Sequence, residues 1–218
     1  MATTSALASA YPSLGRAFLE EVRAGCAGKA YSDWELLALM DFETGGTFDP
    51  SLRNSSGFVG LIQFGGPAAR DLGTTTRELA RMTRLEQLPY VFKYLEQRSG
   101  RRGQLEDLGD LYSAVLWPPG IGKPDSYTFF QRGDGYYGPN SALDTNGDGR
   151  VTKGEATSFV ADRLRGGSSG GGSSGGGGWI PSAPGGGVAG PNPVVVAGTF
   201  AVAAGLFTYS LTDPSSSP

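Results

Sequence analysis

The sequence contains no histidine, a single cysteine and only three more acidic than basic residues among its 218 residues. The absence of histidine excludes catalytic sites that pair serine or cysteine with histidine, and it excludes zinc sites built on imidazole. Because Cys26 is the only cysteine, the chain forms no internal disulfide and indicates no redox compartment. A net charge of −3 gives no general attraction to polyanions, so we expect no nucleic-acid partner.

The C-terminal quarter of the chain differs in composition from the rest. Residues 166–193 are dominated by glycine, serine and proline, which predicts a flexible linker. Residues 194–211 carry no charge and approach the ~20 residues that a helix needs to cross a bilayer. Small residues recur in this run at four-residue spacing, as in helices that associate in lipid. We predict a transmembrane helix there, with a protein-docking segment as the alternative, and a polar tail over 212–218.

The first 165 residues carry the patterns of a helical domain. Apolar residues at helical spacing predict helices over 12–27 and 105–117, and a capping box at Ser32 predicts the start of another. Residues 47–66 contain Gly, Asn, Ser and Pro between short apolar runs, which indicates a loop or a small hairpin. Because strands and helices do not alternate, we predict a mainly α-helical domain over residues 1–165.

Glu43 lies at the end of the helix that begins after Ser32. Leu39 and Met40 precede it at a spacing that places all three side chains on one face, and two glycines then end the helix. A carboxyl group on an apolar face, at the negative end of a helix dipole, favours its protonated form. A general acid near neutral pH requires that form. The alternative is a helix-ending glutamate that reaches water.

A series of motifs follows in order along the chain. They are Glu43-Thr44-Gly45, Phe48-Asp49-Pro50, Asn54, Gly60-Leu61-Ile62-Gln63-Phe64, and segments at 86–91, 110–116, 122–125 and from 143 onward. Together they resemble the lytic transglycosylase and goose-type lysozyme family, in the branch found in phage virion proteins, over roughly residues 30–165. The Ala-Tyr-Asn-Ala-Gly segment of bacterial members is absent, and residues 111–114 take its place. The resemblance implies a lysozyme-like helical fold.

The resemblance also implies roles for individual residues. Glu43 would be the catalytic acid. The residues that would line the sugar groove are Gln63, Phe64, Tyr112, Tyr136 and Asn140. Taken without the resemblance, each tyrosine is typical of a core residue with its hydroxyl at the surface, and Asn140 is typical of a turn.

The substrate implied by the resemblance is peptidoglycan, cut at the β-1,4 bond between N-acetylmuramic acid and N-acetylglucosamine. In a transglycosylase, Glu43 protonates the glycosidic oxygen and then takes the proton of the muramoyl 6-hydroxyl, which closes a 1,6-anhydro ring. A lysozyme-type hydrolase would instead use a second carboxylate to place a water. A structural virion protein that only binds glycan, and a calcium-binding adaptor, are the alternatives outside enzymes.

The expected location follows from the two ends of the sequence. Residues 1–12 show no basic region and no long apolar run, so we recognise no secretory signal. Delivery in a virion would then bring the enzyme to the periplasm or cell wall, with membrane lipid bound through 194–211 and other virion proteins as partners. Release by a holin, or export through the C-terminal segment, are the alternative routes.

A second motif, residues 144–155, fits the EF-hand calcium loop at every diagnostic position. The predicted ligands are Asp144, Asn146, Asp148, the backbone carbonyl of Arg150, Thr152 directly or through water, and Glu155. The helix before the loop is interrupted by Gly138 and Pro139, and no paired loop is present, so we expect a structural calcium ion rather than a sensor. The alternative is an Asp/Asn/Gly-rich turn that binds no ion. We expect no organic cofactor.

Overall fold

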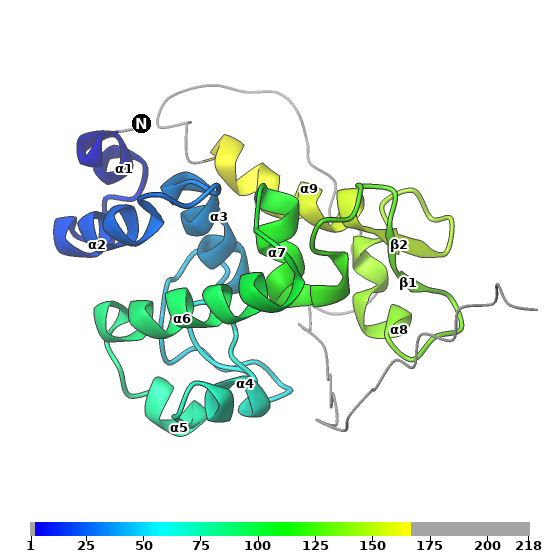
Figure 1. The fold of residues 1–218 in the computed structure, drawn as a ribbon, viewed down its shortest axis with the longest axis horizontal. Coiled ribbons are helices and arrows are strands. Elements are labelled where there is room, and N and C mark those ends of the chain that lie inside the picture. The colour runs from blue at the N-terminus through cyan, green and yellow to red at the C-terminus, as the bar shows by residue number, and fades with distance from the viewer. Residues whose placement is uncertain (1–2, 167–218) are drawn as a thin grey trace, which may run out of the picture.

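The structure, a computed structural model, describes residues 3–166 (Figure 1). The predicted transmembrane helix over 194–211, the tail over 212–218 and all but the first residue of the linker over 166–193 lie outside these residues. Between residues 3 and 166, no helix is both long and apolar enough to cross a membrane.

The described residues form a mainly helical structure, which confirms the predicted class. The α-helices are α1 (Thr4–Ala10), α2 (Arg16–Cys26), α3 (Asp33–Glu43), α4 (Gly66–Asp71), α5 (Thr76–Leu79), α6 (Arg84–Arg102), α7 (Leu108–Leu116), α8 (Tyr137–Asn140) and α9 (Lys153–Gly166). Two short 3-10 helices, η1 (Pro118–Gly120) and η2 (Ser141–Leu143), and the strands β1 (Thr128–Gln131) and β2 (Arg150–Thr152) complete the fold.

The N-terminal helix predicted over 12–27 is wrong at its start. Helix α2 begins only at Arg16, because Gly15 precedes it with a φ of 78°, a left-handed conformation that a helix cannot contain. A separate helix, α1, lies before it and is capped by the Thr3 side chain, which accepts from the Ala6 N–H. Helix α1 buries only Leu7, so it has no periodic apolar pattern that the sequence analysis could detect.

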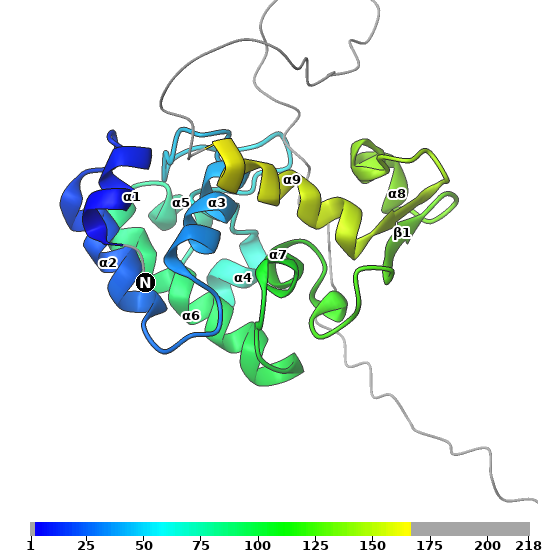
Figure 2. The same cartoon turned by 90° about the horizontal axis from the view of Figure 1, so that it is seen from above.

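Helix α3 lies at the centre of the fold, packed against α2, α7 and α9 (Figures 1 and 2). It begins with the predicted capping box, since Ser32 accepts from the Glu35 N–H and the Glu35 carboxylate accepts from the Ser32 N–H at 2.7 Å. Residues 36–40 are all buried, so the helix buries every face rather than one stripe. Because α3 is central, its C-terminal end is buried, and Glu43 lies in the interior.

The segment predicted over 47–66 as a loop or a small hairpin is a loop with isolated bridges. Val59 pairs with Arg53 and with Phe64, and the rest of the segment consists of turns. The sheet of the described residues lies elsewhere: β1 pairs antiparallel with β2, with Phe130 opposite Val151 (Figure 1). Strand β2 is part of the predicted calcium loop, so this loop is anchored to the fold by a β-ladder.

Candidate active site and calcium loop

The Glu43 side chain is buried at the C-terminal end of α3, with 6% of the residue exposed. Burial penalises the charged form and raises the pKa of Glu43 from 4.5 to about 8. The carboxyl group therefore carries its proton at neutral pH. It meets the electrostatic requirement for a general acid that the sequence pattern predicted.

The chain reverses direction directly after Glu43, and Thr44 holds this turn. Its hydroxyl donates to the Met40 carbonyl at 2.6 Å and accepts from the Phe48 N–H at 3.0 Å. Phe48 has a φ of 50°, which is unusual for a residue with a side chain. Thr44 is 1% exposed, so it acts as a structural cap that fixes the position of Glu43.

Two buried tyrosines lie near Glu43. Burial raises the pKa of Tyr112 and of Tyr94, and the Glu43 charge adds to both shifts. The Tyr94 hydroxyl donates to the Ala114 carbonyl at 3.0 Å. The Tyr112 hydroxyl is also buried but has no hydrogen-bond partner among the described residues. The sequence analysis identified Tyr112 but missed Tyr94, which shows no motif of its own.

Gln63 presents a second unpaired polar atom. Its side-chain nitrogen donates to the Gly60 carbonyl at 3.0 Å, while its Oε1 is buried without a partner. The backbone φ is 51°, a strained value for glutamine of the kind that clusters at functional sites. The next residue, Phe64, packs edge-on against Tyr94 with ring centroids 5.9 Å apart and is 2% exposed. Phe64 therefore supports the site from the core.

The segment that carries Gln63 is held by Gln87 of α6. The Gln87 Oε1 accepts from the Leu61 N–H at 2.7 Å, and its Nε2 donates to the carbonyls of Pro50 and Leu79 at 3.0 and 2.9 Å. A Cβ at Gly60 would lie 2.3 Å from Gln87 Oε1, so only glycine allows this approach. Gln87 is fully buried and acts as a scaffold that the sequence analysis did not assign.

Tyr136 and Asn140 form a second group, around α8. Tyr136 is 40% exposed, and its ring lies 5.7 Å from that of Trp117, the residue that follows α7. Asn140 is buried, donates to the Tyr136 carbonyl at 2.9 Å, and has no partner for its Oδ1 among the described residues. Helix α7 connects the two groups because it carries Tyr112 and ends beside Trp117.

The two other carboxylates near Glu43 in the sequence have partners of their own. Asp41 forms an ion pair with Arg163 of α9 at 3.2 Å. Asp49 accepts from the N–H and the hydroxyl of Ser51 at 2.8 and 2.7 Å, as a turn residue. Of the three carboxylates, only Glu43 is buried.

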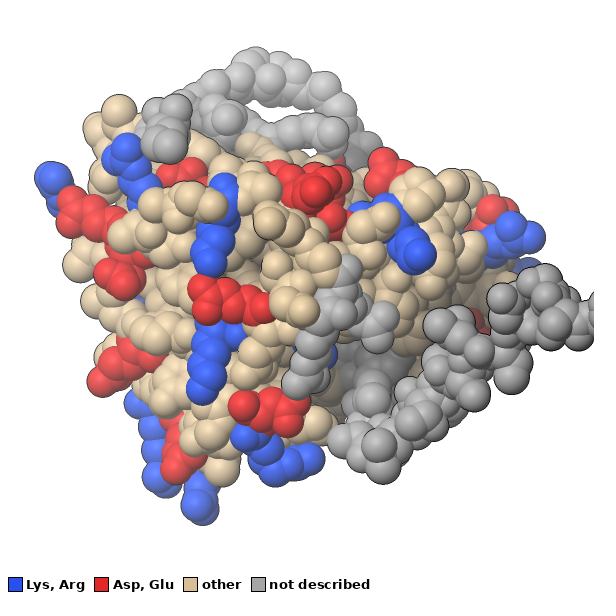
Figure 3. Space-filling view, viewed as in Figure 1, with Lys and Arg blue, Asp and Glu red and all other residues tan. Residues whose placement is uncertain are grey.

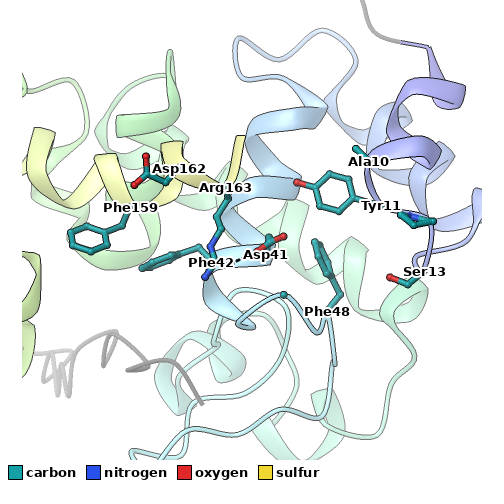
Figure 4. A pocket seen from close by; sticks show the side chains of 11 residues that line it. Ala10, Tyr11, Ser13, Asp41, Phe42, Phe48, Phe159, Asp162 and Arg163 are labelled. Atoms are coloured by element: carbon teal, nitrogen blue, oxygen red, sulfur yellow. Dashed lines mark ion pairs between the residues drawn. The ribbon is translucent and has the colours of Figure 1, made fainter. Parts of the chain in front are cut away.

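Asp41 instead faces a cavity of about 670 Å³ that Glu43 does not line (Figure 4). Aromatic side chains surround it from three elements, with Phe42 and Phe159 on one side and Tyr11 on the other (Figure 4). The Phe42 ring lies 5.6 Å from that of Tyr112 and 6.4 Å from that of Phe159. Phe42 therefore separates this cavity from the surroundings of Tyr112.

The predicted calcium loop is closed by hydrogen bonds between its acidic side chains and its backbone. Asp144 accepts from the N–H groups of Gly147 and Gly149, both at 2.8 Å, and from the Tyr137 hydroxyl at 2.7 Å. Glu155 accepts from the Thr145 N–H at 3.2 Å, across the loop. The hydrogen bond from the Tyr137 hydroxyl lowers the pKa of Asp144. Partial burial acts to raise the pKa of Glu155, but the hydrogen bonds from Thr152 and Thr145 together outweigh it, so this pKa is lowered as well.

The donor set of this loop fits calcium, because all six predicted ligands offer oxygen. Gly149 adopts a φ of 87° and Val151 is buried against β1, as the EF-hand pattern predicts for positions 6 and 8. Within residues 3–166, however, no three side chains of the types His, Cys, Asp and Glu gather around a common point. The loop has the chemistry for the ion, and the ion itself remains a prediction. Its preceding helix is short, as expected, since only α8 and η2 stand before the loop.

Acidic and basic side chains are interspersed on the face of the molecule shown in Figure 3. Comparison with known proteins finds no family model, no curated protein and no solved structure that matches this chain.

Proposed function

We propose that this protein is a lytic transglycosylase with a lysozyme-like helical fold, which cleaves the MurNAc-β-1,4-GlcNAc bond of peptidoglycan. The observation that carries the proposal is the buried Glu43, whose pKa of about 8 keeps it protonated at neutral pH. In this role Glu43 donates its proton to the glycosidic oxygen. It then accepts the proton of the muramoyl 6-hydroxyl as that oxygen attacks the anomeric carbon, which yields a 1,6-anhydro product without a water molecule.

The surroundings of Glu43 support a single-acid mechanism. A hydrolase of the carboxylate-assisted type uses a second carboxylate to place a water, whereas here Asp41 pairs with Arg163 and Asp49 bonds to Ser51. The buried Tyr112 hydroxyl and Gln63 Oε1 have no partner among the described residues, so in this proposal they take sugar hydroxyl and amide groups as partners when the glycan enters. The lysozyme-type hydrolase stays as the second candidate, because a water could be held by groups other than a carboxylate.

Within the same proposal, the loop over 144–155 binds a structural Ca²⁺ ion. The protein acts from a virion, where residues 194–211 hold it at a membrane and the linker lets the domain reach the wall during genome delivery. This part rests on the sequence of residues outside the described range. Structural virion proteins that only bind glycan have no need of a protonated buried acid, which favours the enzyme.

The proposal is tested by turbidity clearing of purified cell wall. Glu43→Gln keeps the shape of the side chain but has no carboxyl proton to donate, so it should lose at least 99% of the activity, about 3 kcal/mol of transition-state stabilisation. Glu21→Gln, which changes an exposed glutamate on α2, is the matched control and should clear the wall like the wild type. More than a few per cent of activity in a folded Glu43→Gln variant would exclude Glu43 as the acid.

A further inference from the structure

A buried ion pair connects the calcium loop to α7. The Lys153 ammonium donates to the Asp110 carboxylate and, at 2.9 Å, to the Lys123 carbonyl. The two side chains are 2% and 4% exposed. A buried charge that loses its partner is strongly destabilising, so this pair holds its two elements in one arrangement.

The two residues of the pair belong to the two candidate sites. Lys153 lies between Thr152 and Glu155, both predicted calcium ligands, and Asp110 lies two residues before Tyr112 on α7. The Asp110 carboxylate also accepts from the Gly122 N–H at 2.8 Å, so it is bound on more than one side.

The packing around the pair leaves no room for a shift. A Cβ at Gly109 would lie 2.7 Å from Lys153 Cε, so the lysine stem lies directly on the backbone of α7. The Ser113 hydroxyl, one turn later, donates to the Gly109 carbonyl at 2.6 Å. A displacement of Lys153 is therefore transmitted to α7 rather than absorbed by loose packing.

We propose that Asp110 and Lys153 are positioning residues that make glycan cleavage depend on calcium. Their ion pair connects the loop over 144–155 to α7. Through α7 it fixes the position of the Tyr112 hydroxyl relative to Glu43. This inference rests on the proposed function. When the ion is absent, the three carboxylates of the loop repel one another, and the loop that holds Lys153 loosens. When calcium binds, the closed loop holds Lys153, Asp110 and α7 in the arrangement of the structure.

The test compares the full-length wild type with the double variant Asp110→Leu/Lys153→Met. Replacing both partners by apolar residues avoids an unpaired buried charge, although the N–H groups of Glu106 and Gly122 lose an acceptor. Lys29→Met, which breaks the surface pair with Glu96, is the control. Each protein is assayed for kcat and KM with calcium and with chelator, and hydrogen exchange is followed in the peptide that covers α7. Binding is followed by terbium luminescence, since Tyr137 donates to the ligand Asp144 and can sensitise the ion.

In the wild type and Lys29→Met, chelation should lower kcat about tenfold, within the ~5–150-fold typical of coupled sites, and should speed exchange in α7. In the double variant, terbium should still bind, while kcat is low and α7 exchange is fast with or without calcium. A folded wild type whose kcat ignores chelator, or a double variant that keeps the calcium response, would overturn the inference. Wild type that is inactive even with calcium, yet still shows calcium-dependent protection of α7, would instead overturn the proposed function and the positioning role with it.

Discussion

The raised pKa of Glu43 predicts a specific dependence of stability on pH. The folded state holds the proton of Glu43 up to about pH 8, whereas the unfolded chain releases it near the ordinary value of 4.5. Between these values the folded state binds more protons, so the wild type loses stability as pH rises. At about 1.4 kcal/mol for each pH unit between the two pKa values, the loss reaches up to roughly 5 kcal/mol.

Glu43→Gln removes this titration. At pH 4 the wild-type side chain is protonated and resembles glutamine, so the difference in unfolding free energy between the two proteins at that pH records the effect of the substitution alone. By pH 8.5 the variant should have gained up to roughly 5 kcal/mol relative to the wild type, on the same ~1.4 kcal/mol scale. Urea unfolding at several pH values measures the gain, and Glu21→Gln should show none. Parallel curves of unfolding free energy against pH for wild type and Glu43→Gln would refute a buried, protonated Glu43.

Three further predictions follow from the scaffold, the loop and the C-terminal segment. Gln87→Leu should destabilise the fold by about 3 kcal/mol or more, because three backbone groups lose their hydrogen-bond partner at ~1–3 kcal/mol each. An unfolding midpoint in urea equal to that of the wild type would contradict this prediction. Calcium at a hundred times its dissociation constant should stabilise the wild type by ~2.7 kcal/mol and so raise its melting temperature. Glu155→Ala should abolish this rise. A wild-type melting temperature that does not change with calcium would exclude the site. The full chain should partition into liposomes through residues 194–211, whereas a chain ending at Arg165 should stay in the aqueous phase. A monomeric full chain that stays in the aqueous phase without detergent would favour a protein-docking role for residues 194–211.

The features that the sequence predicted correctly are local ones. The capping box at Ser32, the end of α3 and the glycine at position 6 of the loop depend on residues a few positions apart, so their patterns can be found without the fold. The prediction for α2 is wrong only at its start, because Gly15, after which the helix begins, lies inside an otherwise helical pattern. The segment over 47–66 consists mainly of turns, as the loop alternative predicted. The sheet instead pairs β1 with β2, which joins residues about twenty positions apart and has no local signal.

The parts of the site that sequence analysis missed depend on contacts between distant residues. Gln87 contacts Leu61 and Pro50 across more than twenty residues, and Tyr94 reaches Ala114 on another helix. The Asp110–Lys153 pair joins positions 43 residues apart. Gln87, Asp110 and Lys153 lie within motif segments, but the motifs do not indicate these contacts, and Tyr94 lies in no motif. The contacts arise only when the helices pack.

The most direct test of the central claim is mass spectrometry of the muropeptides released from purified peptidoglycan by the wild type and by Glu43→Gln. The account predicts that the wild type releases 1,6-anhydro-muropeptides, which are one water lighter than the hydrolysis products, and that Glu43→Gln releases none. Products with a reducing MurNAc end would contradict the transglycosylase and support the lysozyme-type hydrolase. Equal release of muropeptides by the folded Glu43→Gln variant would contradict the catalytic role of Glu43.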